Sequence, residues 1–275
     1  MSTREMTRYL FTIEKTNHTK KMKSEIKQLQ ELYHKGSKHS NYQVLPSQLL
    51  EYFKEESIEV KSRHEQPRLD CFLSQVDFNG CSVLDIGGNT GFFTFESLKA
   101  GASKLYYCEG NQAHAEFVEL AGKILGYEDK LEVVNRYFSF DNADGQEPVD
   151  ICLLLNVLHH VGDDYGDQEL SVDKAKEEIL RSLNSMTSVA DTLVFQLGFC
   201  WKGDRHKALF ENGTKQELID FVTKGVSGVW NIESIHVPQL VGGAAVYKPF
   251  SDSNSARQDD LGEFLNRPLF IMQKV

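Results

Sequence analysis

Apolar and polar residues alternate along this chain with two periods, one typical of strands and one typical of helices. Short apolar runs rich in β-branched residues predict strands, and apolar residues three to four positions apart predict helices. The predicted strands are residues 81–86, 104–108, 131–135, 150–156, 191–198, 230–237 and 269–274. The predicted helices are residues 20–35, 46–53, 63–76, 92–100, 112–125, 172–183 and 214–224. Strands that alternate with helices indicate an α/β fold, with a parallel sheet and helices on both faces.

The pattern divides the chain into an N-terminal helical cap, residues 1–76, and a main domain, residues 77–275. Residues 1–40 contain nine Lys/Arg and four Asp/Glu, a net charge of +5. The whole chain has a net charge of −10, so residues 41–275 carry −15. The apolar stripe of the basic helix 20–35 is narrow. This favours a helix packed on the main domain over membrane-surface binding or self-association through residues 1–40. Residues 36–66 are expected to form a lid.

Composition narrows the class of protein. The 275 residues are 40% hydrophobic and 25% charged, which is ordinary for a globular chain, and no run of 18 apolar residues occurs. The first 20 residues lack a signal-peptide core. The five cysteines lack C-x-x-C spacing and mostly lie in apolar runs, which indicates reduced thiols. We therefore expect a cytoplasmic protein, and the acidic body argues against extensive nucleic-acid binding.

A glycine-rich turn lies between the first strand of the main domain and the helix that follows. Gly87, Gly88 and Gly91 let the backbone approach a ligand without an intervening Cβ. A dinucleotide fingerprint would have a second glycine where Asn89 stands, and Asp85 lies near the position of its pyrophosphate. The turn therefore favours a cationic ligand, with an ordinary strand–turn–helix corner as the alternative.

A second acidic residue strengthens the ligand-binding interpretation. Glu109 ends the second strand and follows Gly87 by 22 residues. At this spacing, an acidic side chain at a strand end is suited to accept hydrogen bonds from a ribose diol.

These residues resemble motif I of the class I S-adenosylmethionine (SAM) methyltransferases, which is usually Asp/Glu-x-Gly-x-Gly-x-Gly. Asp85, Gly87 and Gly91 match that motif, and Asn89 departs from it. The resemblance implies a Rossmann-like, seven-stranded methyltransferase sheet whose last strand inserts antiparallel, and SAM as the cofactor. The cofactor-binding residues expected on this basis are Asp85, Gly87, Gly88, Asn89, Gly91, Phe92, Glu109, Gly110, Arg136, Tyr137 and Asn156.

Further motifs point, less specifically, to a subfamily. Gly-Phe-Phe at 91–93, Leu-x-x-Leu-His-His at 155–160 and Arg-Pro at 267–268 are similar to small bacterial methyltransferases of polysaccharide and O-antigen gene clusters. The chain also resembles, less closely, the SAM domain of the tRNA wobble-uridine carboxymethyl transferase. Neither Asn/Asp-Pro-Pro-Tyr nor Pro-Cys occurs, which disfavours adenine amino and cytosine C5 methylation.

The candidate catalytic residues follow the fourth strand. A hydroxyl acceptor needs a base to take its proton, and His159 or His160 is suited to that role. The alternative is that one histidine packs under the cofactor while the other bonds a backbone carbonyl. Asp163 and Asp164 could join the histidines around a metal ion. We expect no metal, because these acidic ligands all come from one segment.

A cationic loop after the fifth strand contains candidate substrate-binding residues. Its side chains suggest recognition of a phosphate or carboxylate, with a solvated loop as the alternative. The predicted substrate-binding residues are Tyr42, Trp201, Lys202, Arg205, His206 and Arg267. The resulting hypothesis is O-methylation of a sugar, phosphoglycan or other small polar acceptor. A tRNA-modifying enzyme and a non-catalytic SAM-binding regulator are the alternatives.

Overall fold

The computed structural model describes residues 20–35, 43–56, 58, 60, 62–141 and 145–275. Within those residues, the chain forms one eight-stranded sheet in the order β3-β2-β1-β4-β5-β8-β6-β7. Strands β1 to β5 are parallel, and β8 inserts antiparallel between β5 and β6. The strands are β1 Ser82–Ile86, β2 Lys104–Cys108, β3 Leu131–Val134, β4 Val149–Leu155, β5 Ala190–Gln196, β6 Trp230–Val241, β7 Ala244–Pro249 and β8 Leu269–Lys274. The Rossmann-like α/β fold and its antiparallel last strand are therefore confirmed.

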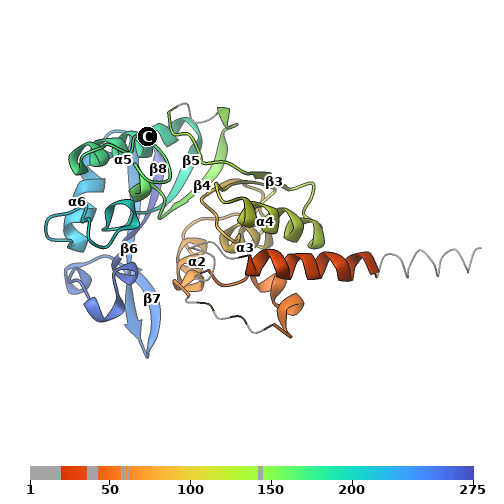
Figure 1. The fold of residues 1–275 in the computed structure, drawn as a ribbon. Helices are drawn as coiled ribbons and strands as arrows, with labels where there is room; N and C mark the ends of the chain where they lie inside the picture. Colours follow the sequence, from red (N-terminus) through yellow and green to blue (C-terminus); the bar gives the residue numbers. More distant parts are fainter. Residues whose placement is uncertain (1–19, 36–42, 57, 59, 61, 142–144) are drawn as a thin grey trace, which may run out of the picture.

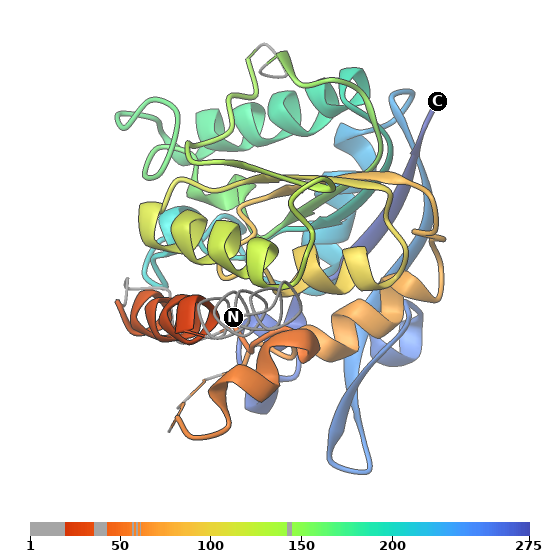
Figure 2. The ribbon, with the colours of Figure 1, turned by 90° about the vertical axis from the view of Figure 1, so that its right-hand side faces the viewer.

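Helices cover both faces of the sheet, so the domain has three layers (Figures 1 and 2). They are α2 Glu65–Leu73, α3 Phe92–Lys99, α4 Gln112–Ile124, α5 Val172–Ser185 and α6 Lys215–Gly225. Residues 20–34 form a further helix. The segment Ser47–Phe53 is a 3-10 helix, labelled η2. The side chains of Asn111, Ser171 and Thr214 cap α4, α5 and α6 by accepting backbone N–H groups of the first turn.

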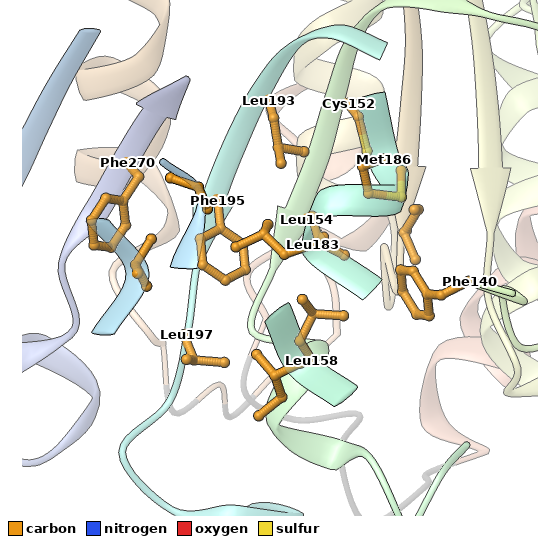
Figure 3. Close-up of a cluster of buried hydrophobic side chains, with 14 of the residues drawn as sticks. Phe140, Cys152, Leu154, Leu158, Leu183, Met186, Leu193, Phe195, Leu197 and Phe270 are labelled. Atoms are coloured by element: carbon orange, nitrogen blue, oxygen red, sulfur yellow. The ribbon is translucent and has the colours of Figure 1, made fainter. Parts of the chain in front are cut away.

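The two-residue period of the strands divides the core into two parts. Leu84, Cys152 and Leu154 point toward α5 and α6, whereas the intervening Val83 and Leu153 point toward α2, α3 and α4. Figure 3 shows the first part, in which side chains of β4, β5, β8 and the α5 region meet. Because both faces of the central strands are covered, those strands are apolar almost throughout.

The N-terminal segments pack against the same core. Leu29, from the helix of residues 20–34, and Leu49, from η2, are fully buried in one cluster with Phe95 and Phe117. The Gln30 side chain also donates a hydrogen bond to the Tyr52 carbonyl oxygen at 2.7 Å. None of the helices described here is both long enough and apolar enough to cross a bilayer.

The sheet has one strand more than the sequence predicted, because β6 and β7 form a hairpin. β6 continues four residues past its predicted end at Val237, and β7 pairs with it antiparallel. The turn is Gly242-Gly243, with φ values of +59° and +84°, the backbone of a tight two-residue hairpin. Pro238 pairs with Tyr247 of β7 and lies past His236, the last residue of β6 that pairs with β8, so one side of β6 is open there and a proline is tolerated. The Gly-Gly pair was the signal for the hairpin.

The central core supplies a test of the packing. Leu154 lies fully buried on β4, between β1 and β5. Leu154→Ala should lower the free energy of unfolding by about 2–5 kcal/mol, because the lost methyl groups leave a cavity. Leu240→Ala is the matched control at an exposed position of β6, and it should change stability by less than about 0.5 kcal/mol. Urea unfolding of both variants checks this, and equal losses would contradict the core assignment.

Candidate functional site

The glycine turn after β1 is held in a narrow conformation by its neighbours. A Cβ on Gly88 would lie 2.6 Å from the Tyr107 ring and 2.8 Å from Asp85 Oδ2. Gly87, Asn89 and Gly91 all have left-handed φ values, of +70°, +53° and +78°. The Tyr107 hydroxyl on β2 donates a hydrogen bond to the Asn89 carbonyl oxygen. The turn therefore needs glycine at 87, 88 and 91, tolerates asparagine at 89, and is held in place by the adjacent strand β2.

Glu109 lies directly after β2, and its carboxylate accepts hydrogen bonds from the two loops beside it. Its Oε2 accepts the Asn89 N–H at 3.0 Å, and its Oε1 accepts the Asn111 N–H at 2.8 Å. A carboxylate has about four lone-pair sites, so both oxygens keep capacity for a ligand hydroxyl. Burial raises the pKa of Glu109, while the backbone hydrogen bonds oppose that shift. The residue thus forms a rigid acceptor at the rim of a cavity.

That cavity, which we call the Glu109 pocket, lies over the ends of β1, β2 and β4. Gly110 forms part of its wall, and a Cβ there would meet the Tyr137 ring at 2.6 Å. Tyr137 is 55% exposed and covers the rim. The remaining lining includes Ile86, Arg136, Phe138, Phe140, His160 and Tyr165. A flat aromatic ring with a polar sugar fits this combination of apolar walls and one carboxylate.

A second cavity adjoins the first, and we call it the arginine pocket. Gly87, Asn89, Asn156, Val157 and His160 line both. The residues that line only the arginine pocket include Gln43, Arg63, Glu65, Arg68, Asp85, His159, Gly203, Phe264 and Arg267. The two cavities therefore adjoin at the five shared residues, and together they form the cleft, which can hold two ligand groups side by side.

Asn156 and Gln196 fix the floor of the arginine pocket at the ends of β4 and β5. Asn156 has a left-handed φ of +63°, and its Nδ2 donates to Gln196 Oε1 at 2.9 Å. Arg267 donates through Nη1 to Asn156 Oδ1 at 2.8 Å. Its other nitrogens bond both oxygens of Glu263, at 3.0 and 2.6 Å. This bidentate pairing fixes the guanidinium plane.

Sequence reasoning missed two arginines of this pocket. Arg63 precedes α2 and Arg68 lies within it, far in sequence from the motifs around the strand ends. Arg68 is 4% exposed and donates through Nη1 to Gln196 Oε1 at 3.3 Å. No local motif distinguishes these arginines from ordinary helix-surface residues.

The two adjacent histidines have different surroundings. His159 is buried and accepts the Gly198 N–H at Nδ1, 3.3 Å away, so its Nε2 carries the proton. Burial, followed by the charges of His160, Arg267 and Arg63, holds the pKa of His159 well below its usual range. His159 is therefore a neutral hydrogen-bond donor. The His160 Nδ1 lies 3.3 Å from Asp164 Oδ2, and its ring lines both pockets.

His160, Asp163 and Asp164 also place ligand atoms within 4.8 Å of one another. All three come from one turn of chain, and exposed acidic groups often gather in this way without a metal ion. The expectation that no metal binds here stays a prediction.

The structure brings Gly203 of the cationic loop to the arginine pocket but none of the cationic side chains of that loop. Trp201 is buried and donates to the Val161 carbonyl oxygen at 2.7 Å, and Lys202 donates to the Gln168 carbonyl oxygen at 2.9 Å. Arg205 and His206 are exposed and line neither pocket. Their predicted substrate role has no geometric support. Only Arg267 of the described substrate candidates faces the cleft.

Two predicted cofactor-binding residues, Gly91 and Phe92, lie behind the turn. Gly91 is the N-cap of α3, and Phe92 is 2% exposed in the core beside Phe93. Neither lines the pockets, so they shape the turn from behind. Tyr42 lies outside the described residues.

Comparisons with known proteins give structural matches only. No family model matches the chain. No curated protein matches it either. A crystal structure of WbdD matches with a TM-score of 0.55 and 15% identity, over 89% of this chain and 46% of WbdD. A crystal structure of monomeric WbdD matches with a TM-score of 0.50 and 15% identity, over 85% of this chain and 46% of that one. This chain therefore spans about half the length of WbdD.

A third match is magnesium protoporphyrin IX methyltransferase (ChlM) from Synechocystis PCC 6803, determined with bound SAM. Its TM-score is 0.47 at 12% identity, over 78% of this chain and 80% of that one.

Asp85 gives this site a testable pH signature. It is 3% exposed, and burial is the main cause that raises its pKa to about 7, although the Thr94 hydroxyl donates to it at 2.6 Å. A carboxyl group whose pKa is higher in the folded than in the unfolded protein stabilises the fold at low pH. The free energy of unfolding therefore falls as the pH rises from the unfolded pKa to the folded pKa. Between pH 4 and 7 the loss should reach about 4 kcal/mol.

Asp85→Asn keeps the shape and the acceptor for Thr94 but cannot ionise. The free energy of unfolding of the variant should therefore rise relative to that of the wild type as pH rises. The difference between the two should be largest above pH 7. Urea unfolding at pH 5 and pH 8 measures this gap. A gap of the same size at both pH values would show that Asp85 is not the titrating group.

Proposed function

Since the chain has the class I methyltransferase fold, we propose that it is a SAM-dependent methyltransferase that transfers a methyl group to an oxygen of a small polar acceptor. The observation that carries the proposal is the pair of joined pockets at the ends of β1, β2, β4 and β5. One pocket is suited to a nucleoside and the other to a second, polar ligand. Their shared wall is where two bound groups would meet.

The Glu109 pocket fits the nucleoside part of SAM. The Glu109 carboxylate keeps lone pairs for a ribose diol, and the apolar walls suit an adenine ring. Gly87 lines both pockets and Gly88 lines the arginine pocket, so the backbone of the turn is open to a ligand there. When bound, SAM supplies a methyl group on a positively charged sulfur, which becomes a neutral thioether after transfer.

The charge of the cleft favours this cofactor over a dinucleotide. A pyrophosphate would bind at the N-terminus of α3. That position is already filled, because Gln43 Oε1 accepts the Phe92 N–H at 3.2 Å and the Thr90 hydroxyl at 2.9 Å. Asp85 and Glu109 also lie at the turn, where they would repel a pyrophosphate and attract a sulfonium.

His160 is the residue we assign as general base. Asp164 lies 3.3 Å from its Nδ1, which would orient the ring and stabilise the imidazolium that forms. His160 would accept the hydroxyl proton at Nε2 while the acceptor oxygen bonds to the methyl carbon. His159 is less suited, because Gly198 already occupies its unprotonated nitrogen.

SAM affinity tests the cofactor assignment. Glu109→Gln should weaken SAM binding by about 1.5–3 kcal/mol, or about 10- to 150-fold, because one charged acceptor is lost. Glu132→Gln is the matched control on the neighbouring strand β3, where the side chain is 54% exposed, and it should leave affinity unchanged. Calorimetry with SAM measures both. Absence of SAM binding to the wild type would refute the proposal.

Turnover separates an enzyme from a SAM-binding regulator. With labelled SAM, an acceptor screen should include nucleotide sugars, phosphoglycans and tRNA. On the acceptor found, His160→Gln should lower the rate by about 10²–10⁴-fold, as expected when a general base is lost. SAM affinity in that variant should fall far less than the rate, because His160 is only one of the residues that line the Glu109 pocket. A rate within about twofold of wild type would exclude His160 as the base.

A further inference from the structure

The first turn of α3 is capped by a side chain from a distant part of the sequence. The N-cap residue of α3 is Gly91, which has no side chain to accept a backbone N–H. Gln43, 49 residues before Phe92, supplies the acceptor instead. Its Oε1 accepts the Phe92 N–H at 3.2 Å and the Thr90 hydroxyl at 2.9 Å. The first N–H groups of a helix have no partner inside the helix, so Gln43 satisfies one of them.

A continuous chain of hydrogen bonds runs from Gln43 through the glycine turn to Glu109. The Thr90 hydroxyl bonds Gln43, and the Thr90 N–H donates to Asn89 Oδ1 at 2.9 Å. The Asn89 N–H donates in turn to Glu109 Oε2 at 3.0 Å. The chain therefore ends at the carboxylate that we assign to the ribose of the cofactor. Because each member has a fixed partner, a shift of Gln43 is transmitted to the turn and to Glu109.

Gln43 belongs to residues 43–53, which we call the cap segment, and this segment is also attached to the domain at points remote from the glycine turn. Leu49 and Phe53 are 0% and 4% exposed in the core. Gln48 Nε2 donates to the Tyr127 hydroxyl at 2.6 Å. Gln43, by contrast, is buried at the wall of the arginine pocket. Its polar side chain therefore connects the cap segment to the cleft, while other residues anchor the segment.

We infer that Gln43 is a positioning residue for the cofactor. It fixes the glycine turn and, through the chain of hydrogen bonds, the Glu109 carboxylate, so that docking of the cap segment and binding of SAM favour each other. This inference rests on the proposed function for the identity of the ligand. Coupling of this kind is reciprocal, because whatever the docked segment adds to cofactor affinity, the cofactor adds to the stability of the docked segment.

Two substitutions of Gln43 separate its acceptor oxygen from the rest of the side chain. Gln43→Leu keeps the approximate size but removes the acceptor of Phe92 and Thr90, and SAM affinity measured by calorimetry should fall about tenfold. Gln43→Glu keeps an acceptor oxygen at the helix N-terminus, where a negative charge is also favourable, and should bind SAM within about threefold of wild type. If both variants lose affinity equally, Nε2 of Gln43 contacts the ligand directly and the positioning role is wrong.

Gln48→Leu is the matched control. It makes the same change in the same segment and removes the hydrogen bond to Tyr127, but Gln48 lines neither pocket. SAM affinity of this variant should stay within about twofold of wild type. An equal loss of affinity in Gln43→Leu and Gln48→Leu would show that any loosening of the cap segment acts on the site, and would overturn the inference. Thermal unfolding confirms that each variant is folded.

Thr90→Val breaks the chain of hydrogen bonds at its middle and stays informative if Gln43→Leu does not fold. Thr90 is buried and lines neither pocket, so its hydroxyl acts on the ligand only through its neighbours. The variant should bind SAM about threefold or more weakly, and it should add little to the loss in Gln43→Leu, because both changes remove the same link. Wild-type affinity in Thr90→Val would contradict the inference.

Hydrogen exchange measures the reciprocal effect. S-adenosylhomocysteine should slow the exchange of the backbone amides of residues 47–53 in the wild type, and by about tenfold less in Gln43→Leu. If the wild type binds SAM but affinity and exchange are the same in Gln43→Leu, the inference is wrong while the proposed function stands. If the wild type binds neither SAM nor S-adenosylhomocysteine, the proposed function fails, and with it the ligand on which this inference rests.

Discussion

Where both faces of a sheet are buried, polar side chains can cluster at the ends of the strands but not along their length. In this chain β1 and β4 are neighbours, but the chain leaves β1 toward β2 on one side and leaves β4 toward β5 on the other. The two loops therefore diverge, and a crevice opens between them. Both pockets lie in that crevice, with Glu109 on the β2 side and Arg267 on the β5 side. The topology of the sheet thus places Glu109 and Arg267 on opposite sides of the cleft.

One buried amide, that of Gln196, holds Arg68 and Arg267 beside the arginine pocket. Gln196 is completely buried, yet its Oε1 accepts from Arg68 and Asn156, and its Nε2 donates to the Tyr247 hydroxyl and the Arg267 carbonyl oxygen. A buried amide without partners would be costly, so this set of contacts offsets its desolvation. The same contacts join α2, β4, β5, β7 and the segment before β8. These contacts with the ends of the strands fix the positions of Arg68 and Arg267.

The sequence was sufficient for the features that depend on short stretches of chain. Seven strands, the glycine turn and the position of Glu109 follow from local periodicity and spacing, which directly reflect burial and backbone freedom. The arginine pocket could not be predicted, because Arg63 and Arg68 meet Phe264 only through the tertiary fold. The loop containing Arg205 was favoured instead because its cations are adjacent in sequence, whereas in the structure they face solvent. β7 was missed although Gly242-Gly243 gave a local signal.

The β6–β7 hairpin, which extends beyond the rest of the sheet (Figure 1), also decides which strand is left open to other molecules. Without β7, the twelve residues of β6 would present a long row of unpaired backbone groups, the usual template for aggregation. β7 pairs with the last six residues of that edge, His236 to Val241, and itself ends in exposed Lys248 and Pro249, a charge and a residue that has no N–H to donate. The opposite edge, β3, has only four residues. The short strand β3 and the charged, proline-ended strand β7 are therefore poor seeds for intermolecular β-pairing, which limits the ways in which two folded chains can join edge to edge.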